Sequence, residues 1–224
     1  GSGTIASYAW SNSLGSGSTA TASPTANTTY SVTVTNSNTC TIAGNISIVV
    51  NANPTATPTA SPVSICTGTS TTLSANAVAG SGTISSYTWS NSLGSASTAT
   101  ASPTNATISN VTITYLVTVT NSNNCSDTGL VNVIVNPKPS INNDSIAICS
   151  QTPFKVVPQN PNDGIVPAGT LYSWGAPTTT GNISGGSAGS NMVDSIIGNL
   201  KNLEIVPRVA IYTVTPKSSV ALGS

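Results

Sequence analysis

The chain has 224 residues but only five basic and five acidic side chains, and it contains no histidine. Charged residues make up 4% of the chain, against about a quarter in an ordinary globular protein. With 38% hydrophobic residues and zero net charge, the composition argues against disorder, which combines low hydrophobicity with high net charge. The four lysines and the single arginine are scattered and form no basic patch for nucleic acid or anionic membranes. No apolar run approaches the roughly 18 residues of a membrane span.

The first predicted elements lie in residues 1–53. Residues 1–15 recur almost unchanged at 80–94, an offset of 79, and residues 30–40 recur at 115–125, an offset of 85. Tyr30, Val32 and Val34 alternate with hydroxyl residues, and this two-residue period predicts a strand with one buried face. The Asn-rich residues 36–39 supply a hairpin turn. We expect this first unit to be partial, with its opening portion belonging before Gly1.

Residues 54–137 are predicted to form a complete copy, the second unit. Two apolar alternations flank the turn at residues 121–124, one on Tyr115, Val117 and Val119 and the other on Val131, Val133 and Val135. Seven or so short strands in a period of about 83 to 85 residues favour a two-sheet sandwich. Proline-rich stretches at 53–62 and 136–139 are predicted to be semi-rigid linkers.

Residues 138–224, the third unit, are a divergent copy. Ile148-Cys149 matches Ile65-Cys66, Tyr172-Ser-Trp174 matches Tyr87-Thr-Trp89, and residues 212–215 match 115–118. The strand equivalent to 131–136 is missing, so this copy is also expected to be partial. The repeats predict an all-β chain of tandem sandwiches arranged in a line.

One tryptophan and two tyrosines recur in each copy, which predicts a shared core. The core residues expected on this ground are Trp10, Trp89, Trp174, Tyr30, Tyr115 and Tyr212.

Small sandwiches are marginally stable, so we expect the cysteines to help hold them together. A disulfide between Cys66 and Cys125 would close a loop of about 60 residues and add roughly 4 kcal/mol to the free energy of unfolding. Because disulfides persist only in oxidising compartments, this pairing implies that the protein lies in one. Cys40 and Cys149 would then be half-pairs whose partners lie outside the fragment. The alternative is a metal site, but the spacing is tens of residues, there is no histidine and no C-x-x-C motif occurs.

The acidic residues offer little for catalysis. Asp163 and Asp194 are the pair considered for acid–base work, yet no carboxylate recurs between copies and no histidine could activate a nucleophile, so we predict no enzyme, no catalytic residue and no cofactor. Calcium at the oxygen-rich residues 142–144 and 162–163 is the remaining alternative. Strands around 46–50 and 131–135 lack lysine and proline, so exposed edges there would pair with other copies of the chain.

These motifs together resemble the immunoglobulin-like and PKD-like repeats of large Bacteroidetes-type bacterial cell-surface adhesins, and the third unit resembles the PKD-like type most. The motifs that carry the resemblance are Ile65-Cys66, Tyr87-Thr-Trp89, the strand at 114–120 with its turn and Cys125, and the closing 133–137. A tyrosine two residues before the second cysteine, as in immunoglobulin domains, is absent.

The resemblance implies an extracellular repeat region, often exported by type IX secretion, that serves as a stalk, filament or adhesin, including those used in gliding motility. Its partners would be neighbouring repeats, further copies of the chain and surface glycans. It also implies O-glycosylation of Ser145 and Ser195, each in an Asp-Ser-Ile acceptor sequence. The alternative function is that of carbohydrate-binding accessory modules of a secreted hydrolase.

Overall fold

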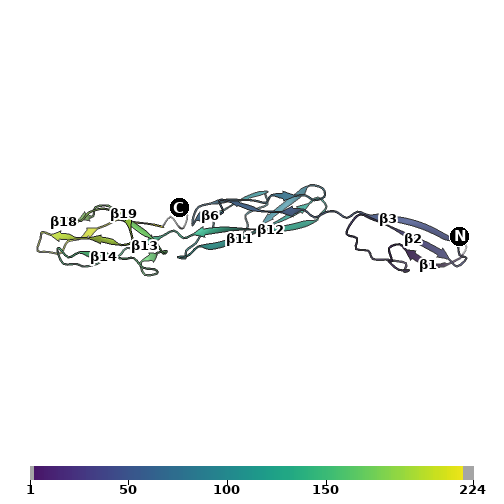
Figure 1. Cartoon of the computed structure of the whole chain (residues 1–224), viewed down its shortest axis with the longest axis horizontal. Helices are drawn as coiled ribbons and strands as arrows, with labels where there is room; N and C mark the ends of the chain where they lie inside the picture. Colours follow the sequence, from purple (N-terminus) through teal and green to yellow (C-terminus); the bar gives the residue numbers. More distant parts are fainter. Residues whose placement is uncertain (1–2, 219–224) are drawn as a thin grey trace.

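The computed structural model describes residues 3–218, and Figure 1 shows them as three β-rich bodies strung in a line. Every regular element within that range is a strand, so the range contains no helix that could cross a membrane. The all-β prediction is confirmed. The alternating valine, isoleucine and threonine residues fit the pleated surface of a sheet, and low charge leaves few side chains that must remain in water.

The first unit is a single three-stranded antiparallel sheet. Its strands are β1 (Ile5–Trp10), β2 (Thr28–Asn36) and β3 (Thr41–Ile48), in the order β1-β2-β3. The turn predicted at residues 36–39 joins β2 to β3, with Thr39 in the left-handed region at φ 63°. The described part of this unit holds no second sheet opposite the first.

The second unit is a complete sandwich. Its strands are β4 (Thr55–Ala56), β5 (Thr59–Ser61), β6 (Ser64–Cys66), β7 (Thr71–Ser74), β8 (Ala77–Val78), β9 (Ile84–Trp89), β10 (Thr98–Ala101), β11 (Val111–Asn121) and β12 (Ser126–Asn136). The sheet β6-β12-β11-β9 faces the sheet β10-β7-β5, while β4 pairs with β8. Between them Leu73, Val117, Val119, Val133 and Val135 are fully buried.

The third unit is built from shorter pairings. Its strands are β13 (Ser140–Ile141), β14 (Phe154–Val156), β15 (Gly164–Ile165), β16 (Leu171–Trp174), β17 (Thr178–Thr179), β18 (Ile183–Gly185), β19 (Gly189–Val193), β20 (Ile196–Gly198), β21 (Leu200–Asn202), β22 (Ala210–Ile211) and β23 (Val214–Lys217). The central sheet is β19-β16-β23, and a small core forms around Tyr172, Trp174 and Ile196.

The three units share one pairing register. The tryptophan at the end of its strand lies opposite a valine in each: Trp10 opposite Val32, Trp89 opposite Val117 and Trp174 opposite Val214. The indole N–H also donates to a backbone carbonyl in each unit, Gly17 O at 3.0 Å, Ala96 O at 3.0 Å and Ser187 O at 3.2 Å. The repeat therefore extends from the sequence to hydrogen bonds that recur in every unit.

Four of the six predicted core residues are buried, and two are not. Trp89, Trp174, Tyr30 and Tyr115 are 3%, 6%, 7% and 3% exposed, as expected. Trp10 and Tyr212 are only half-buried. Trp10 was expected in a closed core, and it differs from Trp89 because no described strand covers its face of the first sheet.

The interpretation of residues 53–62 as a linker was wrong, and only one of the two strands considered as edges is an edge strand. The proposed linker 53–62 contributes β4 and β5 to the second unit, with Pro54 fully buried, because alternate side chains of this segment face the core. The strand around 131–135 is not an open edge along its whole length, since β6 pairs in parallel with residues 134–136. In the first unit β3 is an edge strand, and Ile42 and Ile46 are exposed on it.

Candidate functional site

The cysteines stand at the ends of the second unit, so the predicted disulfide between Cys66 and Cys125 is wrong. Cys66 lies opposite Asn136 at the last residue of β12, whereas Cys125 directly precedes the first. Eleven residues of strand at about 3.3 Å each separate the two positions by roughly 36 Å, and a disulfide needs Cα atoms within about 7 Å. Cys40 and Cys149 are exposed, and none of the four forms a disulfide within the described residues.

The chain entering the second unit is fixed by hydrogen bonds. Asn121, fully buried at the end of β11, donates from Nδ2 to Ala52 O at 3.2 Å and to Ala79 O at 3.0 Å. Ser81 N donates to Ala52 O at 3.2 Å, and Ala52 N donates to Ser81 Oγ at 2.9 Å. Residue 52 is therefore held by the body of the second unit rather than hanging in a flexible linker.

Gly80 completes this joint, which we call the Asn121 joint and define by Ala52, Asn53, Gly80, Ser81 and Asn121. Gly80 has φ +67°, and a Cβ there would lie 2.1 Å from Asn53 O. Only glycine allows both the left-handed backbone and this close approach. The Asn121 side chain also shapes its own hairpin, because Oδ1 accepts from Asn123 N and Cys125 N, each at 3.0 Å.

The second joint is made by direct continuation of a strand. β12 ends at Asn136, Pro137 is fully buried, and β13 begins at Ser140, so three residues separate the units' strands. Asn136 Nδ2 donates to Ser64 Oγ at 3.0 Å and Asn136 O accepts from Thr67 N at 3.0 Å. Proline fixes φ at residue 137, and Asn136 is hydrogen-bonded through both its side chain and its backbone carbonyl. The connection is therefore stiff where it begins.

The residues considered for calcium are brought together without forming a cage of ligands. Asn142 N donates to Asp163 O at 2.8 Å and Asn142 Nδ2 donates to Asn162 O at 3.4 Å, because β13 and β15 pair here. The Asp163 carboxylate already accepts from Gln159 N at 2.7 Å. No group of three acidic, histidine or cysteine side chains gathers anywhere in residues 3–218, so calcium remains an untested prediction.

The two predicted glycosylation sites differ in access. Ser195 is 6% exposed and its hydroxyl donates to Asp194 Oδ1 at 3.0 Å, so a sugar on Oγ has no room and the prediction for Ser195 is wrong. Ser145 lies exposed in the connection between β13 and β14. Glycosylation of Ser145 therefore stays a prediction.

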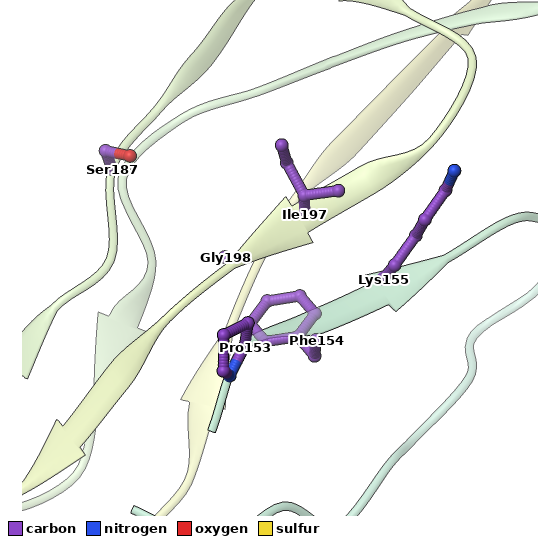
Figure 2. A pocket seen from close by; sticks show the side chains of 6 residues that line it. All are labelled: Pro153, Phe154, Lys155, Ser187, Ile197 and Gly198. Atoms are coloured by element: carbon purple, nitrogen blue, oxygen red, sulfur yellow. The ribbon is translucent and has the colours of Figure 1, made fainter. Parts of the chain in front are cut away.

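One hollow lies on the surface of the third unit, with a volume of about 450 Å³. Its lining residues are Pro153, Phe154 and Lys155 at β14, Ile197 and Gly198 on the paired strand β20, and Ser187, which Figure 2 shows on a separate segment. Phe154 meets the Tyr212 ring edge-on, with ring centroids 5.8 Å apart and planes at 62°. The hollow has no carboxylate in its lining, so Asp163 and Asp194, the pair weighed for catalysis, do not meet there.

A second hollow, of about 150 Å³, lies on the uncovered face of the first unit. It is lined by Trp10, Leu14, Ala20, Ala22, Tyr30, Ile46 and Ile48. In the second unit the equivalent face is closed by the sheet of β5, β7 and β10.

Sequence reasoning missed Asn121, the central residue of the first joint. In a chain so rich in asparagine it was assigned only to a turn. The signal that could have found it is a paired recurrence: Gly-Ser-Gly-Thr occurs at 1–4 and 80–83, and Asn-Ser-Asn follows in both copies, at 36–38 and 121–123. Two distant motifs that are retained together indicate contact between them.

A comparison with protein families found a match inside the second unit. Residues 61–135 match the family described as K319L-like, PKD domain, so a PKD-like domain lies within the second unit. No curated protein matches the chain.

Solved structures with low similarity to this chain were also found. A structure of carbohydrate-binding modules from the β-sandwich superfamily has a TM-score of 0.37 and 15% identity, covering 75% of this chain and 85% of that chain. SGBP-B of the Bacteroides ovatus mixed-linkage glucan utilization locus, in complex with a mixed-linkage heptasaccharide, has a TM-score of 0.21 and 9% identity, with coverage of 96% and 59%. The S-layer protein rSbsC has a TM-score of 0.22 and 18% identity, with coverage of 92% and 32%.

Proposed function

We propose that this chain is a structural and adhesive repeat region of a large, secreted or surface-anchored bacterial protein, and that it serves as a stalk, filament or adhesin outside the cell. On this proposal the working parts are mechanical. The sandwiches act as spacers, the joints set the direction of the next unit, and exposed surfaces contact neighbouring copies or surface glycans.

The Asn121 joint is the observation that carries the proposal. A flexible tether between independent domains would leave its backbone groups to water, yet both the N–H and the C=O of Ala52 are bonded to the second unit. Fixing backbone costs about 1 to 2 kcal/mol of conformational entropy per residue. A chain that orders its connection at this cost favours a defined direction between units, which is what a stalk requires and a loose linker does not.

The alternative of carbohydrate-binding accessory modules lacks a feature that this function favours. Sugar rings stack on exposed aromatic faces, and a flat platform of two rings would favour this function. Phe154 and Tyr212 instead meet at 62°, while Trp89 and Trp174 are buried. The hollow of the third unit therefore supports this alternative less well than the joints support a spacer.

Small-angle X-ray scattering of the full chain tests the proposal. The 11 residues of β12 at about 3.4 Å each make one unit nearly 40 Å long, so three units in line should span about 110 Å. A rod of that length has a radius of gyration above roughly 30 Å, whereas a compact chain of 224 residues has about 17 Å. A radius near the compact value would contradict a spacer function.

A further inference from the structure

A pull on the two ends of the second unit acts along its strands. The chain enters this unit at Ala52, whose carbonyl is bonded by Asn121 where β11 ends, and β12 starts from that same end of the unit. β12 then runs along the unit to Asn136, where the chain leaves for the third unit. Figure 1 shows β11 and β12 lying lengthwise in the line of the three units. Tension in the chain is therefore directed along β12.

The incoming segment of this unit lies alongside β12 and runs in the same direction. Near the start of β12, Ala56 N donates to the Asp127 carboxylate at 3.3 Å. Further along, residues 56–58 pack so closely on Gly129 that a Cβ there would lie 2.4 Å from Pro58 Cδ. At the far end β6 pairs in parallel with β12, and the register sets Ser64 opposite Ile134, Ile65 opposite Val135 and Cys66 opposite Asn136. The segment that brings the load in and the strand that takes it out are therefore neighbours along the unit.

The parallel pairing of β6 with β12 is the contact on which such a load falls. Tension draws β6 back toward the first unit and draws Asn136 toward the third, so the two strands are pulled past each other. The bonds of a parallel ladder are evenly spaced along the strands, so sliding strains them together. Peeling the strands apart from one end would break the same bonds one at a time. Rupture by sliding therefore needs a larger force, because several bonds must fail in one step.

Further hydrogen bonds extend this ladder at both of its ends. Ile134 N donates to Val63 O at 2.9 Å, and Thr67 N donates to Asn136 O at 3.0 Å. The Asn136 side chain is 3% exposed, and its Nδ2 donates to Ser64 Oγ at 3.0 Å across the same two strands. A side-chain bond thus adds to the backbone bonds that sliding would break.

The inner side of the ladder is shielded from water. Ile65 is 4% exposed and Val135 is 0% exposed, and both belong to the core of the second unit. The chain just before β6 is also fixed, because Thr71 Oγ1 donates to Pro62 O at 2.6 Å. Hydrogen bonds are stronger where water is excluded, so this ladder resists sliding better than one on an open sheet.

We propose that the second unit bears tension along the chain and that the pairing of β6 with β12 is its mechanical clamp. The clamp consists of residues 63–67 and 134–136. When the ends of the unit are pulled apart, the unit stays folded until this ladder shears, and residues 54–66 then separate from β12 and open the core. The inference rests on the proposed function, because a stalk or filament carries tension between the objects that it joins.

Single-molecule force spectroscopy of the full chain in two pulling directions provides the test. The four native cysteines are replaced by serine, and handles are attached through new cysteines at exposed positions. Asn53→Cys with Lys138→Cys loads the clamp lengthwise, whereas Ser70→Cys with Lys138→Cys peels β6 from β12 beginning at one end. At one loading rate we expect the lengthwise unfolding force to exceed the peeling force by at least about twofold, because forced unfolding follows the barrier to the first rupture.

The gain in length identifies the unit that unfolds in the lengthwise experiment. About 80 residues at about 3.5 Å each, less about 40 Å of folded length, should lengthen the chain by about 240 Å. Only events with this gain are compared between variants.

Asn136→Ala weakens the clamp itself. It removes the side-chain bond to Ser64, so the lengthwise force should fall by about a fifth, since roughly five bonds shear together in the parent. The peeling force should change little, because there the bonds break singly. Ser85→Ala is the matched control, because Ser85 Oγ bonds Thr120 O and Asn121 O between β9 and β11, outside the clamp. The control should unfold at the lengthwise force of the parent.

Three results would overturn the proposal. The first is an equal unfolding force in the two pulling directions. The second is a fall in the lengthwise force for Ser85→Ala as large as for Asn136→Ala, since the resistance would then be spread over the sheet. The third is a fall of both forces in the same proportion for Asn136→Ala, which would indicate a general loss of stability. None of them changes the length of the chain in solution, so the spacer function is tested separately by scattering.

Discussion

Tyr172 in the third unit combines complete burial with an unsatisfied hydroxyl group. The residue is 1% exposed, and its Oη finds no hydrogen-bond partner among the described residues. Burial raises the pKa of the Tyr172 phenol above its ordinary value of 10.0, and the nearby Asp163 carboxylate raises it further. A buried hydroxyl without a partner costs roughly 1 to 3 kcal/mol, so this position is a weak point of the unit.

Tyr172→Phe should therefore stabilise the third unit, by about 1 kcal/mol at neutral pH. The folded state disfavours the phenolate, so the stability of the parent chain is complete below pH 10.0 and declines as the pH rises above it. The stability of the variant should decline less steeply as the pH rises. Some pH dependence should remain, because burial also raises the pKa of Tyr212. Hydrogen exchange of the β16 amides between pH 9 and 11 measures this, with Tyr87→Phe as the control in the second unit. Faster exchange in Tyr172→Phe would contradict the account.

The cysteines provide the second prediction at the residue scale. Cys66 and Cys125 lie roughly 36 Å apart, so neither can act as a covalent staple for the other. Dithiothreitol should leave the thermal midpoint of the second unit unchanged, and Cys125→Ser should unfold like the parent. A fall in the midpoint on reduction, equivalent to about 4 kcal/mol, would indicate a disulfide within the unit and contradict the strand register.

At the scale of elements, Gly129 and Gly44 are two equivalent positions with opposite surroundings. Gly129→Ala would place a Cβ against Pro58 and Ala56 O, so we expect the second unit to lose about 1 to 3 kcal/mol. Gly44→Ala faces open space and should be neutral or slightly stabilising. Urea unfolding monitored by tryptophan fluorescence compares the two variants. Equal effects would mean that the crossing of β4 and β5 over β12 is wrong.

The strands were predictable because their signal is local. Tyr115, Val117 and Val119 alternate within five residues, and the Asn-rich turn follows directly, so the β11–β12 hairpin required no knowledge of distant contacts. The failures all concern contacts between distant segments. The residues around Cys66 carry no pattern that predicts the parallel pairing of β6 with the last residues of β12. Likewise the prolines at 54 and 58 were interpreted as part of a linker, because the packing of Pro58 on Gly129 depends on a strand that lies much later in the sequence.

The same limit applied to the candidate site. The repeats predicted an in-line array, but the residues that orient one unit on the next could not be distinguished from ordinary turn residues. Asn121 acts through Ala52 and Ala79, which are 69 and 42 residues away in sequence. In the sequence Asn121 therefore looks like an ordinary turn residue, although its side chain also bonds the carbonyls of Ala52 and Ala79.

At the scale of the whole molecule, the Asn121 joint should decide whether the first two units move together. Without the Nδ2 donor, the carbonyls of Ala52 and Ala79 each lose a partner that lies in a buried site, and the connection should loosen. We expect Asn121→Ala to let the first unit tumble faster than the second, seen as diverging rotational correlation times in ¹⁵N relaxation. In the parent chain the two units should share one value.

The matched variant is Asn36→Ala, which removes the same hairpin bonds from the first unit and leaves the Asn121 joint intact. It should disturb the β2–β3 turn without uncoupling the two units, whereas Asn123→Ala, an exposed neighbour, should do neither. If Asn121→Ala tumbles like the parent, then the direction of the units is set by proline stiffness alone and the joint is not a mechanical element. If Asn36→Ala uncouples them equally, then the loss comes from turn geometry rather than from the bonds to Ala52 and Ala79.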